Sequence, residues 1–344
     1  MIDNSHKKEW ISLLRVIATI AVVILHVASP ILNQYNDIMI SYWHIGNVYD
    51  SMVRCSVPLF FMVSGVLLLN KDYELLVFLK KRIIRIIPPL FFWSFIYTIY
   101  YVFVNYQELK DISWLYLVKE FIFKVLFEGA HFHLWFVYSI LGLYLFVPIL
   151  RKWVKSSTDN EILYFLILWF ITLVSQINLL KPYIPQIDLI NFSGYIGYFV
   201  LGYYLNRLDF KSKVFPLLLY ILGFVVTFLG TYYLTSKKGI FVASFYKYLS
   251  PNVLIASIGV FLLVKNLSIR NLWLKRVITM IDNNSFGIYF SHVLFIYMFN
   301  YFGLNWSYIH PIVGIPLITI LVLVMSNMII SILKKNRYTR IISG

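Results

Sequence analysis

The sequence is poor in charged residues and nearly free of cysteine. Only 13% of its 344 residues are Asp, Glu, Lys or Arg, whereas soluble domains carry about 25% charged residues. The single cysteine, Cys55, excludes an intramolecular disulfide. Its place in an apolar run favours a packed thiol over a reactive one. The shortage of charge excludes an ordinary soluble domain.

The sequence also lacks the short motifs of several enzyme classes. It contains no H-E-x-x-H and no cysteine pair, and its 7 histidines are scattered along the chain, so we expect no metal site. It has no G-x-S-x-G elbow, no P-loop and no G-x-G-x-x-G, which disfavours hydride transfer and NTP hydrolysis. No small-residue cleavage site follows the first apolar run, so we expect no cleavable signal peptide.

Long apolar runs are what the sequence has in abundance. Its residues are 60% hydrophobic and 19% aromatic, and the mean hydropathy is +0.77. About 20 consecutive apolar residues cross a bilayer. We therefore predict an all-α, polytopic integral membrane protein, with one domain over residues 1–344 and no appended soluble domain. About ten transmembrane helices are predicted, at residues 10–32, 48–69, 86–106, 132–150, 161–180, 190–206, 214–235, 249–265, 284–304 and 311–333.

Positive charge follows this topology. The net charge of +15 would also suit a nucleic-acid partner, so the location of the charges matters more than their sum. With the N-terminus in the cytoplasm, 21 of the 30 Lys and Arg residues fall in inner segments and 7 in outer segments. This asymmetry agrees with the positive-inside rule. We therefore predict that both termini are cytoplasmic and that nucleic acid is not a partner.

The outer segment before the fourth predicted span has helical periodicity of its own. Apolar side chains recur at helical spacing between residues 114 and 125, with Lys119, Glu120 and Lys124 interleaved. The pattern predicts an amphipathic helix lying on the outer membrane surface.

Ionisable side chains within spans are costly, at about 2.5–3.5 kcal/mol each on the lenient insertion scales. The first span holds Arg15 and His26, eleven residues apart. Eleven residues advance about 20° beyond three full turns, so both lie on one stripe of a helix, about 16 Å apart along its axis. Separately, Arg15 could snorkel to the interface and His26 could hydrogen-bond a neighbouring helix. Their shared stripe favours a polar cavity.

Two further arginines, Arg82 and Arg85, share a face at the start of the third span, followed by Pro88 and Pro89. Such a pair suits phosphate recognition. From the spacing alone, ordinary positive-inside anchoring or contact with lipid headgroups is the favoured explanation.

Other polar residues stand near the predicted outer face. Arg54 lies in the second span, His133 and Trp135 lie in the HFHLWF stretch that opens the fourth, and Ser285, Tyr289 and His292 share one face of the ninth. Each has a simpler interpretation, as a snorkelling, solvated or packing side chain. Taken together they indicate a tunnel with arginines at its inner mouth and aromatic groups at its outer mouth. Such a tunnel suits transfer of a group from a cytoplasmic phosphorylated carrier to a hydroxyl acceptor, with an imidazole as base.

Five motifs in this order resemble the acyltransferase family 3 membrane proteins over nearly the whole chain. They are R-x10-H (Arg15, His26), SVPLFFMVSG, R-x-x-R with its prolines, HLWF, and SFGIYFSH. The VPLFFM and HLWF sequences most resemble those of the branch that contains the enterobacterial common antigen O-acetyltransferase.

The resemblance implies acetyl-CoA or another acyl-CoA as co-substrate. His26 would be the general base or a proton relay, Arg15 would orient or neutralise the donor, and Arg82 and Arg85 would hold coenzyme phosphates. We expect a cell-envelope glycan or lipid-linked saccharide as acceptor, with Arg54, His133, Trp135, Ser285, Tyr289 and His292 as substrate-binding residues. Unlike many glycan-acylating members, this chain has no esterase-like extra domain, so it would acylate its acceptor directly or use a partner.

The expected location is the bacterial inner membrane, in contact with membrane lipids. The alternative function is a polysaccharide or small-solute transporter or exporter, because ten helices around a polar tunnel fit that class too. An exporter needs a wide aromatic-lined path and no coenzyme site, whereas an acyltransferase needs His26 and the arginines together.

Overall fold

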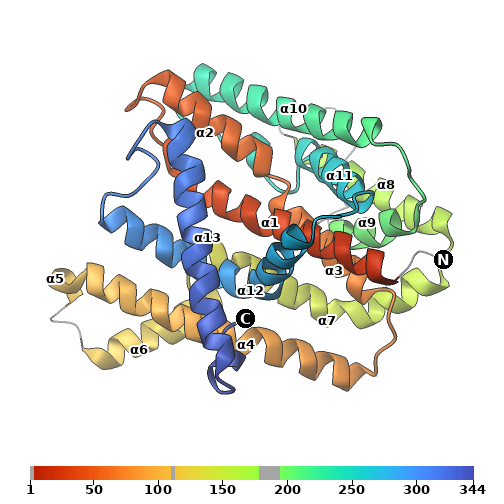
Figure 1. Ribbon diagram of the computed structural model, residues 1–344, viewed down its shortest axis with the longest axis horizontal. Helices are drawn as coiled ribbons and strands as arrows, with labels where there is room; N and C mark the ends of the chain where they lie inside the picture. Colours follow the sequence, from red (N-terminus) through yellow and green to blue (C-terminus); the bar gives the residue numbers. More distant parts are fainter. Residues whose placement is uncertain (1–3, 110–112, 178–193) are drawn as a thin grey trace.

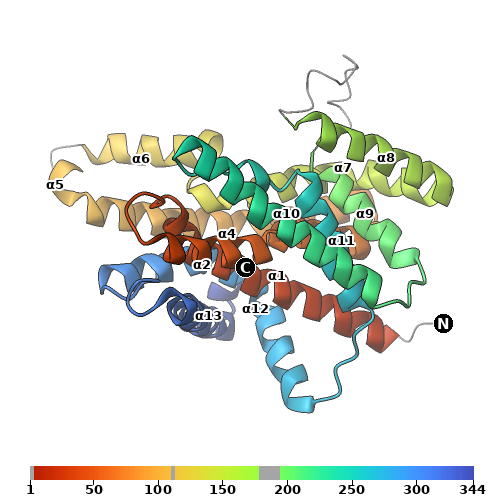
Figure 2. The same cartoon turned by 90° about the horizontal axis from the view of Figure 1, so that it is seen from above.

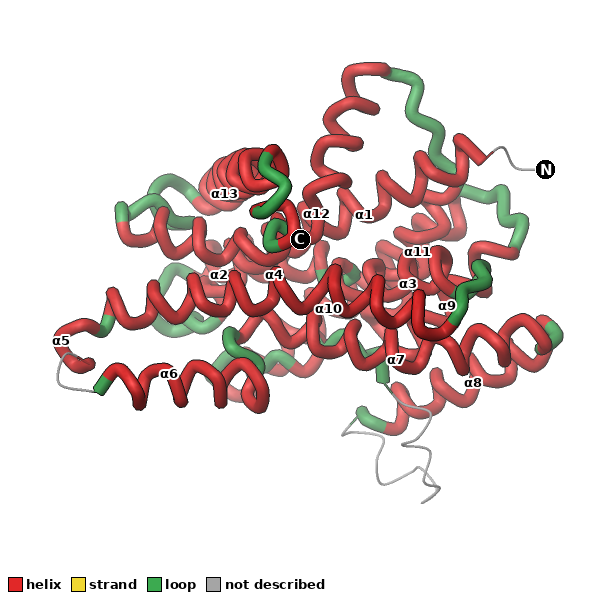
Figure 3. The backbone as a smooth tube through the Cα atoms, turned by 90° about the horizontal axis from the view of Figure 1, so that it is seen from below, coloured by secondary structure: helices red, strands yellow, loops and turns green. Residues whose placement is uncertain are grey.

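The computed structural model describes residues 4–109, 113–177 and 194–344, and these form helices and connecting segments without strands (Figures 1 and 3). Parts of the predicted fifth and sixth spans, together with Lys110 and Lys181, lie outside the described residues. The helices are α1 Asn4–Leu32, α2 Ile40–Val53, α3 Ser56–Leu68, α4 Leu75–Val104, α5 Tyr106–Leu109, α6 Trp114–Phe123, α7 Trp135–Ser156, α8 Asp159–Ser175, α9 Ile196–Arg207, α10 Val214–Lys238, α11 Pro251–Lys265, α12 Leu272–Tyr301 and α13 Pro311–Lys335.

Seven candidate membrane spans occur in the described part of the chain, each long and apolar enough to cross a bilayer. They are Glu9–Leu32, Ile40–Leu68, Leu75–Val104, Trp114–Ser156, Val214–Lys238, Ser244–Lys265 and Pro311–Lys335. The other three predicted runs correspond to α8, α9 and α12. The chain is therefore an all-helical, multi-pass membrane protein.

Helix α1 is the central element of the bundle (Figures 1 and 2). It packs against α2, α3, α11, α12 and α13. Leu14, Ala18 and Val22 are buried along it, as expected for a helix with neighbours on most sides. Because α1 lies in the interior, its polar side chains face other helices rather than lipid.

The second predicted span consists of two helices rather than one. Helix α2 ends at Val53 and α3 begins at Ser56, so Arg54 and Cys55 form the break. By contrast, α4 runs without interruption through Pro88 and Pro89. Arg54 and Cys55 keep right-handed helical backbone angles, so the break is local and Arg54 still pairs with Asp50 four residues before it.

Two glycines allow α3 and α9 to pack closely. A Cβ built on Gly65 would overlap the backbone of Phe199, and a Cβ on Gly202 would overlap the backbone of Met62. Small residues at helix crossings permit this approach inside membranes. The contact fixes α3, which carries part of the site, against a neighbouring helix.

Helix α6 forms at the position predicted for an amphipathic helix. Ser113 caps it by accepting a hydrogen bond from the backbone N–H of Tyr116, at 3.3 Å. Phe121 contacts Phe95 of α4 at 6.1 Å between ring centroids. Helix α6 thus folds back beside the second half of α4 (Figure 2).

Candidate active site

Arg15 and His26 both project from α1, and each reaches a different group of side chains. The Arg15 guanidinium pairs with Asp282 of α12, with 2.7 Å between Nη2 and Oδ2. The Asp282 side chain is only 7% exposed. A buried carboxylate of this kind needs its cation partner. The pair therefore fixes the Arg15 side chain in place from a helix 267 residues away in sequence.

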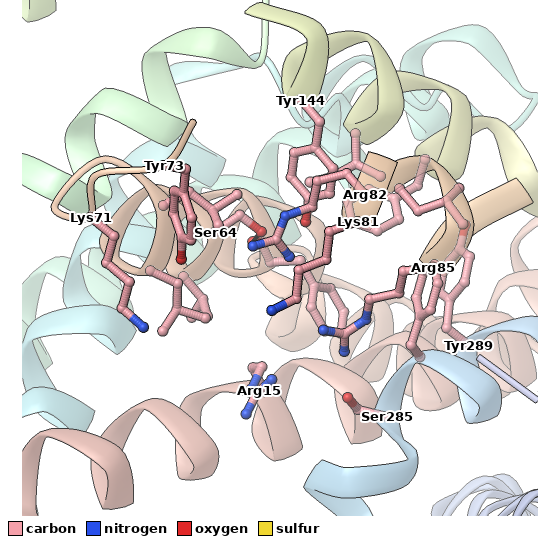
Figure 4. A pocket seen from close by; sticks show the side chains of 18 residues that line it. Arg15, Ser64, Lys71, Tyr73, Lys81, Arg82, Arg85, Tyr144, Ser285 and Tyr289 are labelled. Carbon is pink, nitrogen blue, oxygen red and sulfur yellow. Dashed lines mark hydrogen bonds between the residues drawn. The ribbon is translucent and has the colours of Figure 1, made fainter. Parts of the chain in front are cut away.

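A pocket of about 300 Å³ opens beside Arg15, which we call the basic pocket. Figure 4 shows cationic groups from α1 and α4 turned toward one shared space. Its cationic lining residues are Arg15, Lys71, Lys81, Arg82 and Arg85, and no carboxylate is among its described lining residues. Such a concentration of positive charge suits a ligand with several phosphates.

Aromatic side chains and a clamped loop shape the basic pocket. The Arg82 guanidinium carbon lies 5.3 Å from the ring centroid of Phe78 and 5.5 Å from that of Tyr144. The loop that carries Lys71 and Tyr73 is held by Arg151, which donates to their carbonyl oxygens at 3.2 and 2.9 Å. Aromatic contacts thereby orient Arg82. Arg151 holds the loop at the rim of the pocket in place.

Histidines that are scattered in sequence meet at the middle of the fold. The His26 ring lies 5.1 Å from His292 and 6.2 Å from His133, measured between centroids. His133 and His292 are themselves 5.3 Å apart, and His131 contacts His133 with 2.8 Å between Nδ1 atoms. We call these four residues the histidine cluster. Among the described residues, no group of three or more His, Cys, Asp or Glu side chains is arranged to hold a metal ion.

Backbone contacts orient one ring of the histidine cluster, that of His292. His292 Nδ1 lies 2.7 Å from the carbonyl oxygen of Tyr289 and 3.1 Å from that of Ile288. A carbonyl only accepts hydrogen bonds, so Nδ1 carries the proton and Nε2 keeps a lone pair. This buried Nε2 has no hydrogen-bond partner in the part of the chain that the structure describes. The Tyr289 hydroxyl, in turn, donates to the carbonyl oxygen of His133.

A second pocket, of about 490 Å³, lies beyond the histidine cluster toward the C-terminal end of α1. We call it the aromatic pocket. Trp135 stacks on Tyr248 at 5.6 Å and contacts Tyr195 at 5.4 Å. Ser29 and Asn33, at the end of α1, also line it. Since Ser29 and Asn33 follow His26 by three and seven residues, they lie on nearly the same stripe of the helix.

Arg54, one of two cations that line the aromatic pocket with Lys247, is held by buried groups. Its Nη2 atom lies 2.5 Å from Oδ1 of Asp50, a residue that is completely buried. Its Nη1 donates to the carbonyl oxygen of Tyr246 at 3.3 Å, and its guanidinium lies 4.0 Å from the centroid of the Tyr246 ring.

The structure thus separates the predicted residues into three groups. Arg15, Arg82, Arg85, Ser285 and Tyr289 line the basic pocket, and Arg54 and Trp135 line the aromatic pocket. The histidine cluster contains His26, His133 and His292. Ser285 and Tyr289, expected as substrate-binding residues, line the basic pocket together with its cations.

Sequence reasoning missed several residues of these sites. Asp50 and Asp282 are carboxylates within or beside apolar runs. Because a charged side chain in a membrane span is costly, their positions in the sequence could have identified them. Lys81 stands four residues before Arg85 and therefore shares its face. Tyr246 and Tyr248 lie in a connecting segment, where nothing in the local pattern indicated a role.

Comparison with known proteins identifies the family of the chain. The family model described as an acyltransferase domain, acyltransferase family 3, matches residues 8–333. No protein of curated function and no solved structure matches the chain. The matched region spans nearly the whole chain, from the first turns of α1 to the last turn of α13. The chain therefore belongs to acyltransferase family 3, whose members transfer acyl groups.

Proposed function

We propose that the protein transfers an acyl group, acetyl in the simplest case, from cytoplasmic acyl-CoA to a hydroxyl of a cell-envelope glycan or its lipid-linked precursor, in the bacterial inner membrane. One observation carries the proposal. The basic pocket and the aromatic pocket both border α1, and His26 stands on the stripe between them.

The basic pocket is the proposed donor site. Coenzyme A carries several phosphates, and the guanidinium groups of Arg15, Arg82 and Arg85 match phosphate oxygens in geometry and charge. Arg15 and His26 are about 16 Å apart along α1. An extended pantetheine arm bridges such a distance, so the phosphates stay at the arginines while the thioester approaches the imidazole.

The acyl transfer itself requires one base. His26 takes the proton of the acceptor hydroxyl while that oxygen attacks the thioester carbonyl carbon. A C–O bond forms, the C–S bond breaks, and the departing thiolate receives the proton from the imidazolium. The reaction is therefore balanced without a net proton. The free lone pair of His292 Nε2, on a ring 5.1 Å from His26, is suited to accept the N–H of His26 and to stabilise its charged form.

The aromatic pocket is the proposed acceptor site. Trp135, Tyr195 and Tyr248 offer apolar ring faces for the C–H surfaces of a sugar, while Ser29 and Asn33 offer hydrogen bonds to hydroxyls. The proposal requires a sugar hydroxyl to reach His26 from this pocket, whose lining residue Ser29 stands three residues after His26 on α1.

The test is acyl transfer by purified protein in lipid, with radiolabelled acetyl-CoA and envelope glycan fractions. We expect His26→Ala to lower transfer by roughly 10²–10⁴-fold, the usual contribution of a general base. The matched control is His44→Ala, which removes an imidazole outside the histidine cluster. Equal label transfer by His26→Ala and the unaltered protein contradicts the assignment. Glycan movement across vesicles without label transfer favours the exporter function instead.

A further inference from the structure

The aromatic pocket carries more positive charge than a neutral sugar requires. Its lining contains Arg54 and Lys247, and no carboxylate is among the lining residues that the structure describes. The remaining polar lining groups are neutral, and they include the side chains of Ser29, Asn33 and Gln176 as well as tyrosine hydroxyls. Neutral groups of this kind are sufficient to bind hydroxyls. The two cations therefore need a separate explanation.

The Arg54 side chain is held in a fixed position in the pocket. It is 12% exposed and is paired with the fully buried Asp50. Burying an ion pair costs several kcal/mol of desolvation per ion, and hydrophobic replacement is often neutral or stabilising. A charged pair that is retained inside a membrane protein therefore indicates a functional role.

A buried polar network fixes the segment that faces Arg54. The Tyr246 hydroxyl donates to Oδ1 of Asn47 at 2.5 Å, and Ser51 donates to the same oxygen at 3.1 Å. Asn47 donates in turn to the carbonyl oxygen of Phe228, at 3.1 Å. The contacts join α2, α10 and the segment before α11. The ring and carbonyl that orient Arg54 are thereby rigid.

Arg54 also retains binding capacity. A guanidinium has five N–H donors in a fixed fork. One contact goes to Asp50 and another to the carbonyl oxygen of Tyr246, while Nε has no hydrogen-bond partner among the described residues. Arg54 thus remains able to donate to a ligand in the pocket that it lines.

The charge balance indicates how much negative charge the ligand carries. Arg54 and Lys247 contribute two positive charges and Asp50 contributes one negative charge, which leaves the pocket with one positive charge in excess. Coenzyme phosphates do not supply the missing anion in the proposed mechanism, because they occupy the basic pocket beyond the histidine cluster. The anion must come from the acceptor side.

We propose that the aromatic pocket binds an acidic saccharide, whose sugar ring packs on Trp135 and Tyr248 while one anionic group pairs with Arg54 and Lys247. The anion is either a sugar carboxylate or a phosphodiester, since both accept charge-assisted hydrogen bonds. The inference rests on the proposed acyl transfer, because it names the acceptor class of that same site.

The test compares acceptors that differ only in charge. The first is a radiolabelled tetrasaccharide that contains a hexuronate, the second is the same tetrasaccharide with its carboxyl group reduced to hydroxymethyl, and the third carries a glycerol phosphodiester in place of the carboxylate. Binding to purified protein in neutral-lipid nanodiscs is measured without acetyl-CoA, and transfer from acetyl-CoA is measured separately. The anionic compound that binds more tightly identifies whether the acceptor carries a carboxylate or a phosphodiester.

We expect at least one anionic compound to bind about tenfold or more tightly than the neutral one, the effect of a charged hydrogen bond. This preference should weaken as salt rises. Lys247→Gln should reduce the preference severalfold without disturbing the fold, because Lys247 is exposed. The matched control is Lys238→Gln, an exposed lysine outside the pocket.

The two proposals fail in different ways. Equal binding of the neutral and anionic compounds, or an unchanged preference in Lys247→Gln, overturns the acidic acceptor while leaving acyl transfer in place. Charge-selective binding without transfer of label to any acceptor supports the anion site and contradicts the proposed catalytic function.

Discussion

The two pockets along α1 differ in how many cations line them and in how exposed those cations are. At the basic pocket, five cations from α1, α4 and the preceding loop face one space, and the ion pair with Asp282 holds Arg15 at 28% exposure. At the aromatic pocket, Arg54 is 12% exposed and its carboxylate partner is fully buried. A ligand with several phosphates needs many accessible cations, whereas one anionic group needs only the oriented guanidinium of Arg54 and the ammonium of Lys247. The number of cations and their burial therefore distinguish the two proposed substrates.

The largest expected effect comes from breaking the buried pair at the aromatic end. Asp50→Asn leaves the Arg54 charge buried without its partner, which typically costs about 3–5 kcal/mol of stability. We expect a clear fall in the midpoint of thermal unfolding in detergent or nanodiscs. The control is Asp72→Asn, whose side chain is 85% exposed and paired with Lys155 at the surface. Equal midpoints for the two variants would contradict the structural importance of the buried pair.

The second effect separates the two pockets by kinetics. In the double variant Arg82→Ala, Arg85→Ala, two charged phosphate contacts are lost, so we expect the KM for acyl-CoA to rise about a hundredfold. The KM for the acceptor should stay within twofold, because these residues do not line the aromatic pocket. Lys80→Ala, on the exposed face of α4, serves as control. A parallel rise of both KM values would show that the pockets are not independent.

The third effect concerns how Arg15 is positioned. Asp282→Asn keeps the shape of the side chain but removes the charge that holds Arg15 at 2.7 Å. We expect kcat to fall about tenfold, since small misplacements of a positioning group cost rate. The KM for acyl-CoA should change less than threefold, because the Arg15 charge stays beside the basic pocket and only its orientation is lost. If KM rises while kcat stays constant, Arg15 serves ground-state binding only.

The smallest effect tests the loop at the rim of the basic pocket. Arg151 is 8% exposed and holds two carbonyl groups of this loop, so Arg151→Ala should raise the KM for acyl-CoA about tenfold. Lys155→Ala breaks only the surface pair and should change this KM less than twofold. A larger kinetic effect of Lys155→Ala would contradict this ranking.

The Lys155 hydrogen bond lowers the pKa of Asp72 below its ordinary 3.8. In Lys155→Ala, an NMR titration should therefore show the pKa of Asp72 raised toward 3.8.

The helical class and the polar stripe of α1 were predictable because both depend on local patterns. Apolar runs predict helices by their length, and the spacing of Arg15 and His26 places both on one face. Packing partners were not predictable. Nothing near Arg15 in sequence indicates Asp282, and nothing near His26 indicates that His133 and His292 approach it.

Helix boundaries illustrate a second limit. The predicted span 284–304 belongs to α12, which begins at Leu272. Lys275 and Arg276 interrupt the apolar run, so a hydropathy criterion excludes the first turns although the backbone remains helical there. The break at Arg54 was also hidden, because an apolar run does not reveal whether its residues form one helix or two.

The central position of α1 has a consequence for biogenesis. Helix α1 is synthesised before α12, and Asp282, the partner of Arg15, follows 267 residues later. At roughly 5–20 residues per second, translation leaves Arg15 without that partner for tens of seconds. The charge of Arg15 therefore lacks this partner throughout the synthesis of the intervening helices, and the pair that fixes it forms only after α12 has joined the bundle.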